Sequence, residues 1–203
     1  MDNIPTLEQM LRQQNGWLTH REALEAGLDP HLLGDAVRQG RLERLQRGVY
    51  RATDALPLGF DDLLEVQLRF PHAVPCLTSA LSFHGLTVHN PSTVEIAVPR
   101  GRHAPRLEFP PLTVYTFTPR LYRYGLETYP LGDLSVRLYT PEKTLCDLLR
   151  FSKRLGMESF LEGLKNYLRA RAGHRPQLPR LLEAAQVCGV TVRLKATLEV
   201  LLT

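Results

Sequence analysis

The segment from Asn15 to Arg51 constrains the fold of this chain more than any other, because several helix signals lie close together in it. Thr19 is a favourable N-cap for a helix from His20 to Ala26, since its hydroxyl can accept an otherwise unpaired backbone N–H. Gly27 follows, and glycine enters the left-handed conformation that ends a helix without strain. The sequence therefore predicts a first short helix here.

A second helix and a hairpin complete this segment. Asp29 caps the second helix, and Pro30 occupies its first position, where the missing N–H removes no hydrogen bond. Gly40 closes the helix, and Arg41 to Arg51 then reads as strand, turn and strand, with the turn at or near Arg47-Gly48. Two short helices followed by a tight hairpin are typical of a winged helix-turn-helix.

The second helix has two distinct faces. Four apolar residues are spaced so that they pack against a core: Leu32, Leu33, Ala36 and Val37. The opposite face is polar and fits the major groove of DNA, where each base pair presents a distinct pattern of donors and acceptors. That face carries His31, Gly34, Asp35, Arg38 and Gln39.

Positive charge is concentrated in the hairpin. The residues from Arg38 to Arg51 include five arginines and one acid, Glu43, for a net charge of +4. The residues from Met1 to Val37 instead hold two arginines and six acids. A local excess of this kind is expected where a protein neutralises DNA phosphates and releases counterions. The alternative is a solvated, Arg-rich hairpin on a winged helix that binds protein.

Composition indicates a soluble globular protein with two modest domains, or one domain and a small module. The hydrophobic fraction is 43% and the charged fraction 23%, and the net charge of +4 permits an anionic partner without requiring one. Cys76, Cys146 and Cys188 suggest neither a disulfide framework nor a zinc site, because they are odd in number and widely spaced. There is no signal-peptide core and no apolar run near the roughly 20 residues that span a bilayer. We therefore expect a cytoplasmic protein outside the membrane.

The proline- and glycine-containing segment ATDALPLG after Arg51 marks a domain boundary. We expect a winged helix-turn-helix DNA-binding domain over residues 1–55 and a second domain over residues 56–203. The second domain is expected to combine a small β-sheet with several packed helices. The predicted fold class is therefore α+β, with helices and strands mixed.

Within the second domain, the sheet is expected at about residues 93–139 and the helical part at residues 141–203. The predicted strands are Val94–Val98, Leu112–Phe117 and Ser135–Tyr139. Thr78 is expected to cap a short helix that ends at Gly85, and Thr140 to cap a longer one. The other predicted helices are Asp61–Phe70, Glu158–Arg169, Leu178–Cys188 and Val192–Leu202.

A second basic segment lies between the first two predicted strands. Residues Pro99 to Arg106 form a loop that carries Arg100, Arg102 and Arg106 and no acid. Such a loop can contact a phosphate backbone or an acidic partner. A mobile, solvated loop is the alternative.

Catalytic motifs are absent from the sequence. It contains no nucleophile elbow, no Walker loop and no dinucleotide fingerprint, and its seven histidines show no metal-ligand spacing. A metal-dependent nuclease needs acids near a strand end and a nearby lysine, yet no lysine follows Glu95 two residues later. We therefore expect no catalytic residue, no metal and no cofactor. An enzyme that acts on nucleic acid remains an alternative, for which Glu95 or Asp133 would be the residues to substitute.

Several stretches resemble one known family. NGWLTHREALEAGLDPHLLGDAVRQGRLERLQRGVYR is similar to the N-terminal winged-helix domain of the AbiEi family, the antitoxins of type IV toxin–antitoxin and abortive-infection systems. TSALSFHGLT, VEIAVPRGRHAP and YTPEKTLCDLLRFSKRLG resemble parts of its C-terminal domain, and LLEAAQVCGVTVRLKATLEVLL fits its closing helices. The most specific parts are R-G-V-Y at the end of the wing and P-E-K-T-L-C-D-L-L. The resemblance spans nearly the whole chain.

The resemblance implies a repressor that is also an antitoxin. The first domain would bind inverted repeats in double-stranded promoter DNA, and the second would counter a nucleotidyltransferase-like toxin that it need not bind directly. By position, the implied DNA contacts are His31, Asp35, Arg38 and Gln39 on the second helix and Arg41, Arg44, Arg47 and Arg51 on the wing. We add Thr19, at the start of the first helix, and count Arg100, Arg102 and Arg106 of the basic loop as additional basic contacts because of their charge. The antitoxin candidates are Lys143, Asp147, Arg150, Lys153 and Arg154. A winged-helix transcriptional regulator without antitoxin activity is the second hypothesis.

Overall fold

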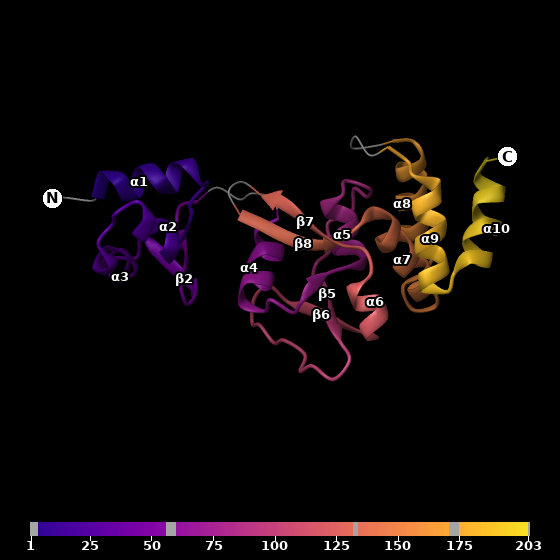
Figure 1. The fold of residues 1–203 in the computed structure, drawn as a ribbon, viewed down its shortest axis with the longest axis horizontal. Helices are drawn as coiled ribbons and strands as arrows, with labels where there is room; N and C mark the ends of the chain where they lie inside the picture. The colour runs from indigo at the N-terminus through magenta and orange to yellow at the C-terminus, as the bar shows by residue number, and fades with distance from the viewer. Residues whose placement is uncertain (1–3, 56–59, 132–133, 171–174, 203) are drawn as a thin grey trace. The chain divides into compact units, whose positions relative to one another are not determined.

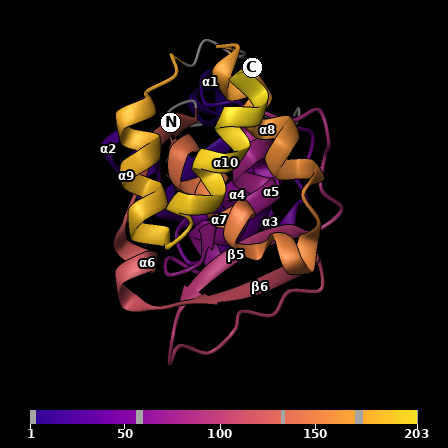
Figure 2. The same cartoon turned by 90° about the vertical axis from the view of Figure 1, so that its right-hand side faces the viewer.

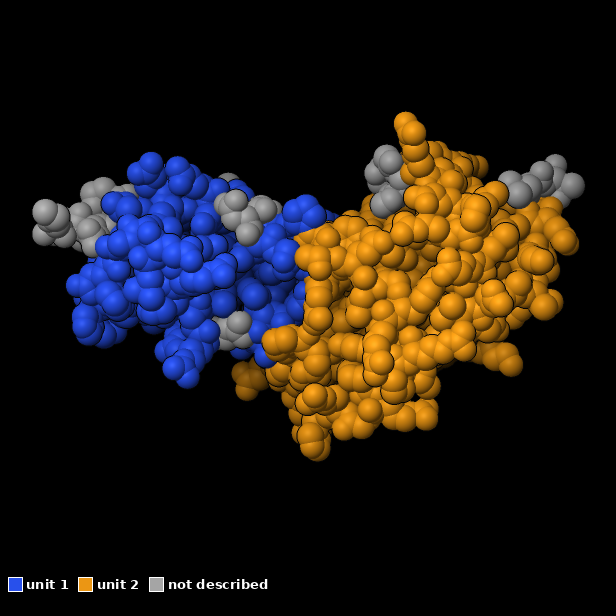
Figure 3. Space-filling view, in the orientation of Figure 1, with its two compact units in different colours: residues 1–69, 130–136 blue, residues 70–129, 137–203 orange. Residues whose placement is uncertain are grey.

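The computed structural model describes residues 4–55, 60–131, 134–170 and 175–202. The chain divides into two compact units, drawn in different colours in Figure 3: Met1–Arg69 with Pro130–Val136, and Phe70–Tyr129 with Arg137–Thr203. Both units mix helices with small sheets, so the predicted α+β class is confirmed (Figure 1). None of the helices in the described ranges is long and apolar enough to cross a membrane.

The first unit begins with the winged helix-turn-helix that the sequence predicts. Its helices are accompanied by a three-stranded antiparallel sheet of order β1-β3-β2, with Leu18 paired to Tyr50 and Leu42 to Ala52. The short strand β1 was not predicted. The elements are α1 (Ile4–Gln13), β1 (Trp17–Thr19), α2 (His20–Glu25), α3 (Pro30–Arg38), β2 (Leu42–Gln46) and β3 (Val49–Ala52).

The predicted helix caps are present. Thr19 accepts a hydrogen bond from the Glu22 N–H, while the Glu22 carboxylate accepts from the Thr19 N–H at 2.7 Å, which is a complete capping box. Asp29 accepts from the His31 N–H at 2.8 Å, and Pro30 opens α3. Local sequence signals therefore account for the start of both helices.

The core of the first unit extends beyond the winged helix. One buried cluster joins α1, α2, α3 and the sheet through residues such as Leu7, Leu18 and Leu33. A second cluster packs Trp17, on β1, and Leu45, on β2, against Leu64. Leu64 belongs to α4 (Asp61–Arg69), so this helix packs on the hairpin. Packing thus places α4 with the winged helix, although the predicted boundary lies at residue 55; the end of the connector, residues 56–59, lies outside the described residues.

Two small sheets replace the single sheet that we expected over residues 93–139. In the first, β5 (Val94–Pro99) runs parallel to β6 (Leu112–Phe117) and antiparallel to β4 (Val74–Pro75). In the second, β7 (Leu126–Leu131) pairs with β8 (Leu134–Tyr139). The prediction of one sheet was wrong because alternation identifies strands but carries no information on their partners.

Helix α7 (Pro141–Leu155) lies at the centre of the second unit, and every residue from Pro141 to Leu149 is buried. Figure 2 shows the three later helices around it. The remaining helices of this unit are α5 (Leu77–Phe83), α6 (Pro119–Arg123), α8 (Glu158–Leu168), α9 (Leu178–Cys188) and α10 (Thr191–Leu202). The predicted cap of α5 was wrong: its N-cap is Cys76, and the Thr78 N–H donates to the Glu95 carboxylate at 2.6 Å.

Candidate nucleic-acid interface

Helix α3 presents the face that the sequence predicts for reading DNA. Leu33 and Ala36 are buried against the first unit's core, whereas His31, Arg38 and Gln39 are exposed. Asp35 accepts a hydrogen bond from the Arg38 guanidinium one turn along the helix. This ion pair neutralises the acid on the reading face, and the Arg38 side chain remains 74% exposed.

The wing carries exposed arginines at its turn and on β2. Gly48 adopts a left-handed conformation with a φ of 81°, which glycine tolerates, and it places Arg47 at the tip. The Gly48 carbonyl accepts from the His20 N–H at 2.8 Å, so the turn is fixed to the start of α2. Arg44 and Arg47 are both exposed. Helix α2 and the wing therefore hold these two side chains on a defined backbone.

Arg41 lies at the base of the wing and is half-buried. Its Nε donates to the Gln39 side-chain oxygen at 3.2 Å, and its Nη1 lies 3.9 Å from a Glu8 carboxylate oxygen. Both partners are exposed residues, so a phosphate can compete for this guanidinium.

Arg51 points to a different environment from the other wing arginines. Its Nη2 lies 3.6 Å from Asp61, its Cζ lies 5.5 Å from the centre of the Trp17 ring, and its side chain is 24% exposed. The Trp17 indole also donates to Asp61 at 3.2 Å. Arg51 therefore joins the hairpin to α4, which corrects the DNA contact expected for it.

Thr19 also has a structural role, as the N-cap of α2. Its hydroxyl donates to the Glu22 carboxylate at 2.6 Å while accepting from the Glu22 N–H. With its only hydroxyl proton held in the capping box, Thr19 positions α2 and has no free donor for a phosphate.

The basic loop of the second unit lies at one edge of the parallel strand pair. The register pairs Pro99 with Phe117, and the Arg100 N–H donates to the Phe117 carbonyl at 2.9 Å. The residues that follow these two strand ends thus share one sheet edge. They carry four exposed arginines: the predicted Arg100 and Arg102, and Arg120 and Arg123 of α6. The predicted Arg106 is also exposed and lies further along the loop.

We did not predict Arg120 and Arg123. The sequence does carry a signal for them, because Glu108 is the one acid in the Arg-rich stretch between Pro99 and Gly125. Burial raises the pKa of the Tyr122 hydroxyl, and the positive charges of Arg137 and Arg102 oppose that rise, so both guanidinium groups act on the same ring. Arg102 of the loop thus acts on Tyr122 of α6, and both elements contribute arginines to this surface.

Two of the antitoxin candidates are core residues. The side chains of Lys143 and Asp147 are fully buried and form an ion pair on α7. The Lys143 ammonium also lies 4.8 Å from the centre of the Phe117 ring and 4.6 Å from that of Tyr139. Burial raises the pKa of the Asp147 carboxyl, and the Lys143 charge opposes this rise. These two residues stabilise the fold and are not placed to contact a toxin.

The other three candidates lie nearer the surface of α7. Arg150 is partly buried, with its Nη1 3.7 Å from Asp147 and its Cζ 4.7 Å from the centre of the Phe151 ring. Arg154 is exposed and lies over the Tyr115 ring at 5.1 Å. Lys153 is exposed beside it. Of the five candidates, Lys153 and Arg154 are thus the ones placed to meet a partner.

The acid that we considered for a nuclease site is buried and hydrogen-bonded within the second unit's fold. Glu95 is buried on β5 and accepts hydrogen bonds from the Tyr115 hydroxyl at 3.1 Å and from the Thr78 N–H. Asp133 lies outside the described residues. Across the ranges that the structure describes, no three His, Cys, Asp or Glu side chains are grouped to hold a metal ion.

Comparison with known proteins finds a family match for the winged-helix segment of the first unit. Residues 6–53, from within α1 to the end of the wing, match the family described as "Transcriptional regulator, AbiEi antitoxin". No curated protein matches the chain. Among solved structures, the RV2827C protein from Mycobacterium tuberculosis is similar at 16% identity and a TM-score of 0.49, over 97% of this chain and 80% of that one. The resemblance noted in the sequence is confirmed over residues 6–53, the part of the chain that the family model matches.

Proposed function

We propose that the protein is a DNA-binding antitoxin that represses its own promoter through the winged helix. The observation that carries this proposal is the set of exposed arginines on α3 and the wing, Arg38, Arg44 and Arg47, within a segment that matches a family of antitoxin regulators. Helix α3 would enter the major groove, where Arg38 can read a guanine edge. The wing arginines would contact phosphates beside it.

The second unit would contribute in two ways. Its five exposed arginines, in the loop after β5 and on α6, would add phosphate contacts that strengthen promoter binding without reading bases. Its other proposed role is to counter a nucleotidyltransferase-like toxin in a type IV system, with Lys153 and Arg154 as the exposed candidates. Both roles depend on binding rather than catalysis, and we propose that they take place in the cytoplasm.

A regulator without antitoxin activity is the second candidate. It is favoured by one observation: the family match ends at residue 53, within the first unit, so it does not extend to the proposed antitoxin region. The two candidates differ in what they predict for the adjacent gene product. Only an antitoxin relieves the toxicity of that product.

The test is a co-expression experiment in which growth is measured with the neighbouring gene induced, alone and together with this protein. We expect the neighbouring product to arrest growth and the full chain to restore it. A Lys153→Glu/Arg154→Glu variant should restore growth less well while binding promoter DNA normally, and Arg21→Glu, on α2, is the matched surface control. A harmless neighbouring product, or arrest that the full chain does not relieve, would exclude the antitoxin role and leave the regulator.

A further inference from the structure

Four residues share the outward side of α3, either adjacent or about one helical turn apart: His31, Gly34, Asp35 and Arg38. The proposed function uses the Arg38 guanidinium and leaves the acid and the glycine without a role. Neither residue suits a helix that only binds phosphates, because a carboxylate repels them and a glycine weakens the helix. Both lie on the side that would meet the bases, so their contacts bear on which sequence the helix reads.

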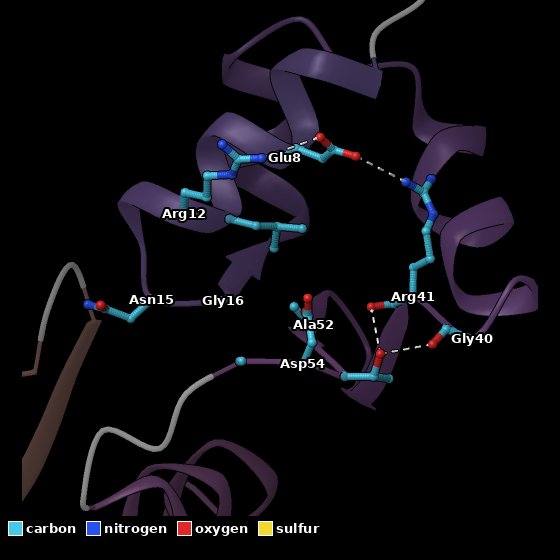
Figure 4. Close-up of a pocket in the computed structure, with 11 residues that line it drawn as sticks. Glu8, Arg12, Asn15, Gly16, Gly40, Arg41, Ala52 and Asp54 are labelled. Atoms are coloured by element: carbon cyan, nitrogen blue, oxygen red, sulfur yellow. Dashed lines mark hydrogen bonds and ion pairs between the residues drawn. The ribbon is translucent and has the colours of Figure 1, made fainter.

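Asp35 fixes the direction of the Arg38 guanidinium. Its Oδ1 accepts a hydrogen bond from the Arg38 Nη2, although the two side chains are 45% and 74% exposed. By comparison, Arg12 and Arg41 each lie 3.9 Å from a Glu8 oxygen, which is beyond the range of a hydrogen bond (Figure 4). Of these three guanidinium groups, that of Arg38 is the one that a hydrogen-bonded carboxylate orients.

The pair keeps enough hydrogen-bonding groups to contact two bases. A guanidinium has five N–H donors, and the bond to Asp35 uses one, so the outer edge of Arg38 can still donate to O6 and N7 of a guanine. The residues that the structure describes supply no donor to the Asp35 Oδ2. This oxygen can therefore accept from the N4 amino group of a cytosine. Residues three apart rise about 4.5 Å along a helix, comparable with the roughly 3.4 Å between base pairs, so the two bases would belong to neighbouring pairs.

A carboxylate also excludes the other three bases at its position. Guanine presents two acceptors and thymine one acceptor in the major groove, and these repel the Asp35 oxygens. Adenine has an amino group, but its N7 acceptor lies beside it. Only cytosine offers an amino group without an adjacent acceptor, so the acid selects against alternatives as well as for one base.

Gly34 leaves free space on the same side of the helix. It lies within α3 and does not adopt the left-handed conformation that favours glycine. A Cβ at this position would meet the Arg38 Nη1 at 3.7 Å, an ordinary van der Waals contact, so alanine would fit in the free protein. The fold therefore does not require this glycine. The missing side chain matters on the outer side, where it lets α3 approach the bases closely.

We propose that Asp35 determines specificity and that the operator carries two neighbouring G·C pairs where α3 enters the major groove. Arg38 would donate to the guanine of one pair, while Asp35 orients its guanidinium and accepts from the cytosine amino group of the next. Gly34 would allow the approach that both contacts need. This inference rests on the proposed function, because it requires the winged helix to bind duplex DNA.

The experiment measures base preference separately from overall affinity. The full chain selects from a pool of duplexes with a randomised central segment, and the recovered site is then varied to all four base pairs at each position. Competition binding compares the parent with Asp35→Ala, Arg38→Ala and the double variant. Glu25→Ala is the matched control, because Glu25 is an exposed acid on α2 that pairs with Arg21 one turn away. This control should keep the parent preference.

We expect the recovered site to contain the two neighbouring G·C pairs. Asp35→Ala should lower the cytosine preference roughly 5- to 150-fold, and it should also weaken the guanine preference because Arg38 loses the group that orients it. Arg38→Ala should remove the guanine preference, and adding Asp35→Ala should change it no further. Asp35→Asn should shift the preference from cytosine towards adenine, which an amide can both accept from and donate to.

The possible failures are distinguishable. A parent that binds no duplex DNA overturns the proposed function and this inference with it. A parent that binds DNA without selecting the G·C pairs overturns the inference alone. So does an Asp35→Ala variant that binds every duplex more tightly with the parent preference, because Asp35 would then only repel phosphates.

Gly34→Ala tests the close approach. The variant should bind the recovered site roughly tenfold more weakly, because its methyl group would lie between α3 and the bases. Its urea unfolding midpoint, followed by the fluorescence of Trp17, should equal or exceed that of the parent, since alanine favours a helix. A loss of binding without a loss of stability cannot come from a structural role. Parent-like binding by this variant would overturn the close approach at position 34.

Discussion

The Arg51 guanidinium lies 3.6 Å from the Asp61 carboxylate, and this ion pair joins the last strand of the wing to α4. The same carboxylate accepts from the Trp17 indole, whose ring lies beside Arg51. One of the five wing-region arginines is therefore part of the packing of the first unit, while Arg38, Arg44 and Arg47 remain exposed. This difference separates variants that should affect folding from variants that should affect DNA binding.

Replacing Arg51 with Ala should destabilise the first unit by roughly 1–3 kcal/mol, because Asp61 keeps its buried position and loses its cationic partner. Trp17 is the only tryptophan, so its fluorescence during urea unfolding reports on this unit. Below the unfolding transition, the salt dependence of DNA binding should equal that of the parent. A lower salt dependence with unchanged stability would instead make Arg51 a phosphate contact.

Replacing Lys143 with Met should destabilise the second unit by roughly 3–5 kcal/mol, because it leaves Asp147 buried without its closest cation. The double variant Lys143→Met/Asp147→Leu should recover most of that loss, since an apolar pair of similar volume removes both buried charges. Chemical denaturation followed by circular dichroism provides the measurement. A single variant as stable as the parent would show that the ion pair is not needed for the fold.

The stability of the first unit should depend on pH through Glu65 on α4. Burial raises the pKa of this carboxyl above its usual 4.5, Arg69 opposes the rise, and Glu43 and Asp62 add to it. The folded state therefore binds the proton more tightly than the unfolded state, so stability falls as pH rises from about 4.5 through the raised pKa.

Glu65→Gln removes this titration, and its uncharged amide can still hydrogen-bond Arg69. We expect the variant to be at least as stable as the parent at pH 7, and the parent to gain stability relative to it as the pH is lowered. Unfolding measured by Trp17 fluorescence over that range tests the sign. The opposite trend, with the parent losing stability relative to the variant on acidification, would mean that Arg69 outweighs burial.

Replacing Arg38 with Ala should relax the preference for one base pair of the operator at a cost of roughly 1–3 kcal/mol, because a guanidinium on α3 can make two hydrogen bonds to guanine. Competition binding with operators mutated at single positions provides the measurement, and Arg21→Ala on α2 is the control. An unchanged base preference in the Arg38 variant would remove this residue from the reading face.

The sequence predicted the winged helix well, because its signals are local. Thr19, Asp29 and Gly48 each act within a few residues of themselves, and the two helix caps and the hairpin turn follow from them. The roles of Arg51 and Lys143 could not be predicted in this way. Asp61 contacts Arg51 and Phe117 contacts Lys143 from distant elements, and a charged residue in a sequence gives no sign that such partners will bury it.

The second unit was predicted less completely for the same reason. Strand β4, like β1 of the first unit, is too short to show alternation; β4 exists through pairing with β5, and β1 through pairing with β3. The basic edge was partly predicted from residues 99–106, but Arg120 and Arg123 join it only because β5 and β6 run parallel and end together. A search for other acid-poor, Arg-rich segments would have found them.

The most direct test of DNA binding by the wing is the salt dependence of promoter affinity for the parent, Arg47→Ala and Arg51→Ala. Because Arg47 lies exposed at the wing tip, its removal should weaken binding to all sequences and reduce the slope of log affinity against log salt by about one unit. Arg51→Ala should keep the parent slope. Equal slopes for the parent and Arg47→Ala would contradict the assignment of the wing to duplex DNA.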